Sequence, residues 1–108
     1  MAQNFRRYTS NDVGTSAATL LTANSYDTIV GISVANVAAT SVIASVYIND
    51  GTNDIYLIKD APLPAGSALQ VLDGGAKFVV QSGDALKVIS DTASSLDVWV
   101  SAVDDISS

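Results

Sequence analysis

The chain has 108 residues, and it contains neither cysteine nor histidine. Without cysteine it can form no disulfide and has no thiolate nucleophile. Without histidine it lacks the commonest general base and the commonest metal ligand. These two absences exclude Ser-His-Asp and Cys-His catalytic sites, and zinc sites built from cysteine and histidine. We therefore expect no enzymatic activity, and we predict no metal site and no cofactor.

Charge is also scarce: charged residues make up 15% of the chain and hydrophobic residues 48%. Glutamate is absent, so the 11 acidic residues are all aspartate, against five lysines and arginines. Arg6 and Arg7 lie at the N-terminal end, which leaves the remaining chain more acidic still. Such a surface repels nucleic-acid phosphates and anionic membranes, so we expect neither as a partner. So little charge on a small domain indicates that another molecule covers part of its outside.

Long apolar runs are missing as well. No stretch approaches the ~18 apolar residues of a membrane-spanning helix, so we expect none. The opening MAQNFRRYTS has no apolar run behind its arginines, so we expect no signal peptide. A chain of this length predicts one domain, which hides roughly 65% of its unfolded surface on folding.

The chain is instead rich in short runs of Val, Ile, Leu and Ala, interrupted by Gly, Asn, Asp and Ser about every 8 to 12 residues. Within several runs apolar and polar residues alternate, which predicts strands with one buried face. We place the strands near 19–23, 28–36, 41–49, 54–60, 68–73, 77–81, 85–90 and 96–103. The pattern predicts an all-β fold: a two-sheet antiparallel sandwich of about eight strands, jelly-roll-like in its connections.

The two ends of the chain differ from this pattern. Residues 1–12 are polar and carry both arginines, which predicts a flexible N-terminal arm. Residues 104–108 offer little to pack and predict a C-terminal tail. The sandwich domain is therefore expected to span residues 13–103.

The stretch VYINDGTNDIYL predicts a β-hairpin with Gly51 and Thr52 at the centre of a type II′ turn. The predicted register pairs Asp50 with Asn53, Ile48 with Ile55, Tyr47 with Tyr56 and Val46 with Leu57. A calcium loop would need its glycine later and a closing glutamate, so the turn is the better interpretation. Pro62 and Pro64 follow, and because proline cannot donate to a ladder, we predict a crossover between sheets there.

The large aromatic side chains alternate with the aliphatic ones. Trp99 falls on the strand face opposite Val98 and Val100, and Tyr47 and Tyr56 fall opposite their aliphatic neighbours. Outward aromatics on a surface with little charge indicate a subunit interface. The candidate interface residues are Trp99, Tyr47, Tyr56, Ile58, Arg6 and Arg7. Two alternatives stay open: Trp99 caps an open end of the sandwich, or the aromatic rings bind a sugar.

Several of these pieces also recur together elsewhere. The segment 46–101 resembles a family of small virion-associated proteins of tailed bacteriophages, notably phages of aquatic bacteria. The shared motifs are a D-G-T hairpin, a K-D-A-P-x-P-A-G-S step, an L-D-G turn, a G-D-x-L-K-V strand and an S-S-x-D-V strand. They fall at Asp50-Gly51-Thr52, Lys59 to Ser67, Leu72-Asp73-Gly74, Gly83 to Val88 and Ser94 to Val98. The opening NFRRYTSNDVGTSAATLL is similar to the family's lead segment.

The resemblance implies a structural part of a phage virion and carries over no catalytic residue. Within the virion we expect a capsid decoration or cement protein that forms a homo-oligomer, for example a trimer, and docks on the major capsid protein. The arginine-bearing arm would then reach onto a neighbouring subunit. A neck, tail or fibre-attachment component is the alternative position. A carbohydrate-binding surface module is the alternative function.

Overall fold

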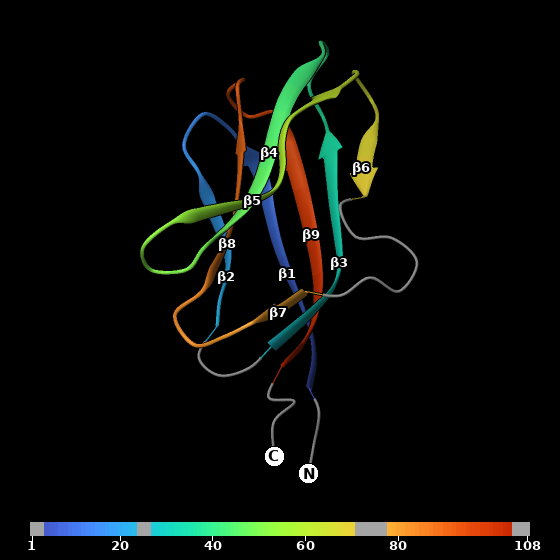
Figure 1. The fold of residues 1–108 in the computed structure, drawn as a ribbon. Coiled ribbons are helices and arrows are strands. Elements are labelled where there is room, and N and C mark those ends of the chain that lie inside the picture. The colour runs from blue at the N-terminus through green and yellow to red at the C-terminus, as the bar shows by residue number, and fades with distance from the viewer. Residues whose placement is uncertain (1–3, 24–26, 71–77, 105–108) are drawn as a thin grey trace.

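The computed structural model describes residues 4–23, 27–70 and 78–104, and these form nine strands in two packed antiparallel sheets (Figure 1). The strands are β1 (Asn4–Val13), β2 (Ala18–Thr22), β3 (Asp27–Asn36), β4 (Val42–Asn49), β5 (Asp54–Leu63), β6 (Ala68–Gln70), β7 (Phe78–Val80), β8 (Ala85–Ser90) and β9 (Leu96–Asp104). Among these residues, no helix is long and apolar enough to cross a membrane. Each of the eight predicted strands occurs. Those predicted near 68–73 and 77–81 extend partly outside the described residues.

The strand order shows how the chain winds into its two sheets. The first sheet has the order β1-β9-β3-β6, with β7 also paired to β3, and the second has the order β2-β8-β4-β5. The pairs are nested: β4 with β5, β3 with β6, β2 with β8 and β1 with β9. The two packed antiparallel sheets confirm the predicted all-β sandwich. The step from β5 to β6 passes from one sheet to the other, so the crossover predicted at Pro62 and Pro64 is also confirmed.

The N-terminal segment differs from the prediction. Residues 4–12 were expected to form a flexible arm, but they form most of β1, which pairs with β9 from Asn4 opposite Asp104 to Val13 opposite Leu96. Val13 is buried and Tyr8 packs against the core, so the strand is held by side chains as well as by its ladder. At the other end, Asp104 belongs to β9, and residues 105–108 of the predicted tail lie outside the described residues.

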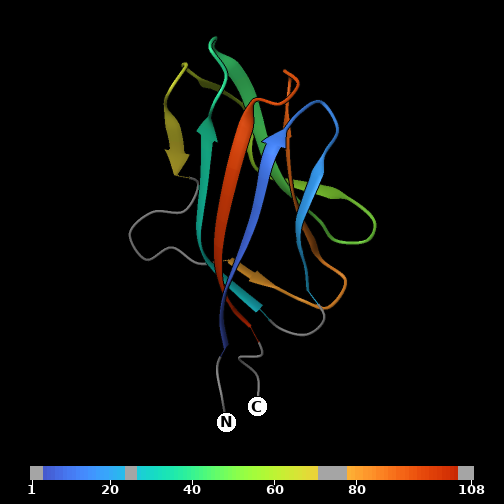
Figure 2. The ribbon, with the colours of Figure 1, turned by 180° about the vertical axis from the view of Figure 1, so that it is seen from behind.

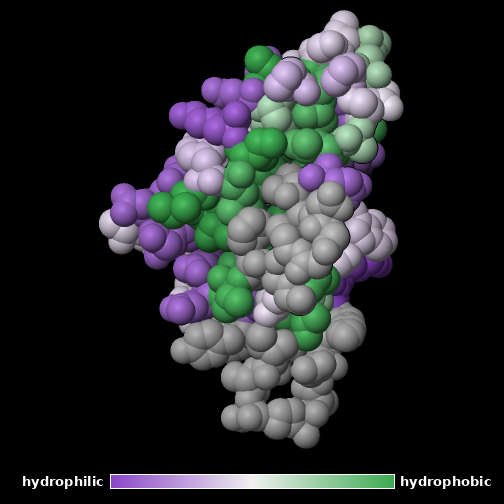
Figure 3. All heavy atoms as spheres, turned by 45° about the vertical axis from the view of Figure 1, so that its right-hand side comes forward, coloured by the Kyte–Doolittle hydropathy of each residue, from purple (hydrophilic) through white to green (hydrophobic). Residues whose placement is uncertain are grey.

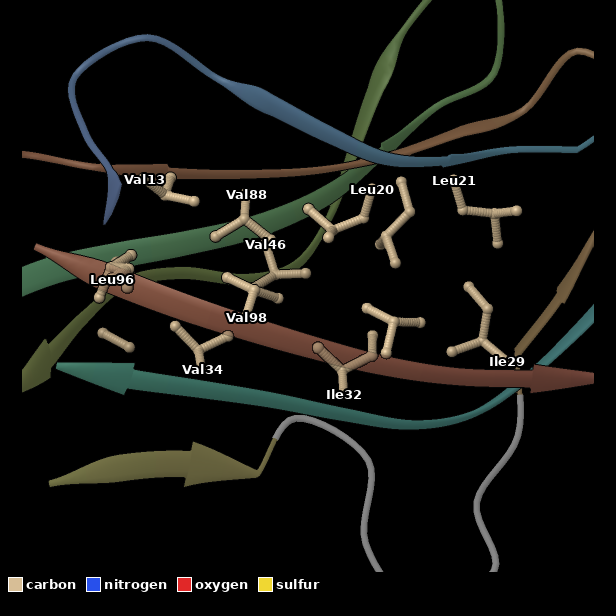
Figure 4. Packing of buried hydrophobic residues seen from close by; sticks show 14 of the residues in the cluster. Val13, Leu20, Leu21, Ile29, Ile32, Val34, Val46, Val88, Leu96 and Val98 are labelled. Carbon is tan, nitrogen blue, oxygen red and sulfur yellow. The ribbon is translucent and has the colours of Figure 1, made fainter. Parts of the chain in front are cut away.

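The core between the sheets is almost entirely aliphatic. Val34 and Val98 of the first sheet face Val46 and Val88 of the second (Figure 4). Each of these side chains is at most 3% exposed. Burying one such side chain contributes about 1.5–3 kcal/mol, so a cluster of this size stabilises the sandwich without any cross-link. Trp99 has no place in this core, and its ring lies outside.

One buried polar side chain ties a loop to the ends of two strands. Asn36, at the end of β3, is 3% exposed. Its Nδ2 donates to the carbonyl oxygens of Thr40 and Leu63, both at 2.9 Å, and its Oδ1 accepts from the backbone N–H of Ala38 at 2.8 Å. The asparagine therefore fixes the loop between β3 and β4 against the end of β5.

Candidate interaction surfaces

The polar turn between β4 and β5 uses its oxygens to hold its own backbone. Asp50 Oδ1 accepts from the N–H groups of Thr52 at 3.0 Å and Asn53 at 2.7 Å. These bonds, the one from Asn53 foremost, hold the pKa of the Asp50 carboxyl below its usual value. Gly51 has a φ of 96°, which suits the first central position of a type II′ turn. In the described part of the chain, no three acidic side chains gather into a possible metal site.

The hairpin register is confirmed near the turn and wrong further from it. Tyr47 lies opposite Tyr56 as predicted, but Val46 lies opposite Ile58 rather than Leu57. A bulge in β5 adds the extra residue between these two pairs. Both Leu57 and Ile58 pack against the core, so Ile58, a candidate interface residue, is only partly exposed.

The β4–β5 hairpin carries what we call the hairpin patch, formed by Ile55, Tyr56 and Lys59, with Tyr56 on the outer face of the second sheet and Ile55 on the other side of the strand. Ile55 is 51% exposed and Tyr56 42% exposed. Lys59 Nζ lies 5.0 Å from the centre of the Tyr56 ring. The Tyr47 ring packs against the Tyr56 ring, with 5.0 Å between the two ring centres. Burial, with the nearby charge of Asp54, raises the pKa of Tyr47. Tyr47 is only 8% exposed, so it supports Tyr56 and offers little surface of its own.

The outer face of the first sheet carries Trp99. The indole is 52% exposed, whereas Val98 and Val100 on either side of it are buried, so the predicted outward orientation is correct. Trp99 lies opposite Thr9 of β1 on one side and Ser33 of β3 on the other. With a strand on each side, it cannot cap an open end of the sandwich. The Arg7 guanidinium lies 5.4 Å from the ring centre, a cation–π distance.

Small polar side chains surround Trp99. A shallow hollow beside the indole is lined by Thr9, Asn11, Ser33 and Asp97, among others. Asp97 Oδ1 accepts from the backbone N–H of Asp12 at 3.2 Å. This face therefore offers an apolar ring together with hydroxyl, amide and carboxylate groups. The sequence alternation placed Asp97 beside Trp99, but it could not bring Thr9 and Ser33 there, because that requires the pairing of β1 and β3 with β9.

A second hollow lies on the same sheet, and we call it the arginine hollow. It is lined by Arg6, Arg7, Val30, Ser101, Ala102 and Val103. Val30 is the extra residue of a bulge in β3, opposite the step from Ala102 to Ser101 of β9, and it is 41% exposed. Both charged groups in this lining are cations. The structure thus places Arg7 on the sheet face near Trp99, and it places both predicted arginines in a strand and not in a free arm.

Exposed apolar side chains are spread over more than these two faces. In the view from the side of β6, apolar areas break the polar surface in several places (Figure 3). The exposed large hydrophobic residues of the described chain are Val30, Val37, Ile43, Ile55, Tyr56, Val79 and Trp99. Since Trp99 belongs to the first sheet and Tyr56 to the second, the two predicted aromatic contacts lie on opposite outer faces of the sandwich.

No protein-family model matches the chain, and no curated protein matches it. Solved structures do. A protein of the Bacillus endospore appendages, described as a novel family of disulfide-linked pili, has a TM-score of 0.57 at 13% identity; the match covers 94% of this chain and 84% of that one. A pentameric capsid protein isolated from metagenomic phage sequences has a TM-score of 0.52 at 18% identity, covering 92% of this chain. This chain spans 60% of that capsid protein's length. At these identities the likeness shows a shared fold.

Proposed function

We propose that the chain is a non-enzymatic structural subunit of a phage virion. The observation that carries the proposal is a small sandwich with exposed aromatic rings, each beside a cation, on both outer faces. Large exposed aromatics on a small domain mark surfaces that a partner covers. The fold likeness to a pentameric phage capsid protein supports the virion role, and so does the sequence resemblance of the segment 46–101.

Within the virion, we propose a capsid decoration or cement protein that forms a homo-oligomer and docks on the major capsid protein. Trp99 and Tyr56 are the proposed anchors, because buried Trp and Tyr contribute most to interface energies. Arg6 and Arg7 offer forked contacts to the carboxylates of a neighbouring aspartate-rich subunit. Tyr47 acts through Tyr56, which it supports from below. A trimer is the expected oligomer.

Quantitative mass spectrometry of purified phage particles tests the proposal through the number of copies per particle. A decoration protein is present in many copies, whereas a neck, tail or fibre-attachment component is present in a few copies at one site. Adding labelled protein to particles stripped of it should restore occupancy, and W99A should bind them more weakly. V37A is the matched control, because Val37 is 50% exposed in a loop away from Trp99. Absence of the protein from particles would refute the proposed function.

A carbohydrate-binding role is the second candidate, and the polar surroundings of Trp99 favour it. Sugar rings stack on an exposed indole while hydroxyl, amide and carboxylate groups bind their hydroxyls. Trp99 is the single tryptophan of the chain, so its fluorescence reports this face alone. Binding of host surface polysaccharide fragments should change Trp99 emission, and D97N should weaken the effect while Y56A leaves it intact. Unchanged emission at saturating glycan would exclude this role.

A further inference from the structure

We propose that copies of this chain associate head to tail, with the β4–β5 hairpin of one copy seated in the arginine hollow of the next. The inference rests on the proposed structural role and specifies its self-contact. The donor is the turn region around Asp50 and Asp54 with the hairpin patch. The acceptor is the floor formed by β1, β3 and β9 around Arg7 and Val30.

The acceptor combines apolar residues with positive charge. Val30, Ala102 and Val103 are its apolar residues, and Arg7, whose guanidinium lies over the outward-facing Trp99, supplies the charge on which the inference rests. The hollow holds about 490 Å³, so it admits a loop with several side chains. A ligand matched to this site carries exposed apolar side chains flanked by carboxylates.

The hairpin has that composition. In both ribbon views its turn projects sideways from the body of the sandwich (Figures 1 and 2). Ile55, two residues after the turn, is 51% exposed. Asp50 lies in the turn and Asp54 directly precedes Ile55 in β5, and both residues are exposed. The hairpin exposes three carboxylates, Asp50, Asp54 and Asp60, against the single cation Lys59. The same chain therefore carries a protrusion with net negative charge and a hollow with positive charge.

The positions of the two surfaces fix the symmetry of the assembly. The hairpin belongs to the second sheet and the hollow to the first, so the two halves of the contact are different surfaces of one chain. A contact between unlike surfaces is heterologous, and repeating it gives a closed ring or an open filament. A trimeric ring has this kind of contact, whereas a two-fold dimer built on one patch does not.

Two exposed substitutions test the contact. V30D places a carboxylate in the hollow, and I55D places one near the turn of the hairpin. Each of the two side chains is more than 40% exposed, so folding should be preserved, as circular dichroism will show. By light scattering and sedimentation, wild type should assemble with rising concentration. Each variant alone should weaken self-association at least about tenfold. Mixed in equal amounts, the two variants should form a one-to-one heterodimer, since I55D keeps an intact hollow and V30D an intact hairpin.

The control is V37D, the same change at a residue that is 50% exposed and outside both surfaces. It should assemble as wild type does. A wild-type chain that stays monomeric at every concentration overturns the inference. So does a V30D or I55D variant that assembles normally, or a mixture that forms no heterodimer. These measurements use no phage particles, so the proposed virion role can fail or stand separately by the particle-binding assay.

Discussion

Asn36 gives the sharpest test of how the sandwich is held together. Its side chain makes three hydrogen bonds, one of them, to the Leu63 carbonyl, fully buried. Replacing it with leucine of similar size leaves two carbonyl groups and one N–H group without their partner. A buried polar group left without a hydrogen-bond partner lowers stability by about 1–3 kcal/mol. The two partly buried groups regain some of this stability by bonding to water. We expect N36L to lower the free energy of unfolding by about 2–4 kcal/mol.

N36D adds a pH dependence whose sign follows from the same geometry. One oxygen of the introduced carboxyl can still accept from the Ala38 N–H, but the other faces the carbonyl oxygens of Thr40 and Leu63. Burial and these oxygens disfavour the charged form, so the folded-state pKa of the introduced carboxyl rises above its unfolded value. A raised carboxyl pKa means that stability is kept below the unfolded pKa and lost as pH rises through the folded pKa. The N36D deficit should therefore be larger at about pH 7 than at about pH 4.

Urea unfolding followed by far-UV circular dichroism measures both effects, at concentrations low enough for the chain to be monomeric. N11D is the matched control, because it makes the same chemical change at an exposed asparagine of the edge strand β1. Its effect should stay within about 0.5 kcal/mol at both pH values. If N36D is no less stable than N11D, or its deficit does not grow with pH, the structural role assigned to Asn36 is refuted.

Two further predictions concern backbone contacts and charge. G14A should lower the free energy of unfolding by about 1–3 kcal/mol, because its new Cβ would lie 3.1 Å from the backbone of Ala93 and of Ser94. G31A, whose new Cβ would have no atom nearer than 3.8 Å, should be close to neutral. Thermal unfolding compares the two variants, and equal effects would contradict the packing argument. Because the pKa of Asp50 is lowered in the folded state, wild type should lose stability as acid protonates this carboxyl. D50N should lose less stability in an acid titration. An equal loss in both proteins would mean that the turn bonds do not contribute to folding.

Much of the fold could be predicted because alternation alone identifies strands with one buried face. The predicted bounds of β8, residues 85–90, are the observed ones, and the predicted hairpin register is correct as far as the pair of Tyr47 and Tyr56. β1 was missed because an edge strand is buried only in places, so NFRRYTSNDV shows no aliphatic alternation. The two bulges of β5 were missed because the apolar pattern of the strand gives no sign of them. At the one between Ala61 and Ile58, the Asp60 N–H donates to Ser45 Oγ of the neighbouring strand, and Asp60 adopts a φ of 55°.

The candidate surfaces were predictable only in part. The outward orientation of Trp99 follows from the period of its own strand, and the structure confirms it. The burial of Tyr47 does not follow, because Tyr56 from the neighbouring strand covers it. The arginine hollow requires three strands and the bulge at Val30, none of which any single segment of sequence contains.

The pairing of β1 with β9 also determines how the domain resists a mechanical load. Asn4 lies opposite Asp104, so the chain enters and leaves the sandwich at the same pole (Figure 2). Tension applied through the two ends would pull across the ladder and open its hydrogen bonds one after another, starting at that pair. A load applied along the strands would have to break many of them at once. The domain is therefore weaker when it is stretched between its two ends than when it is loaded along its strands.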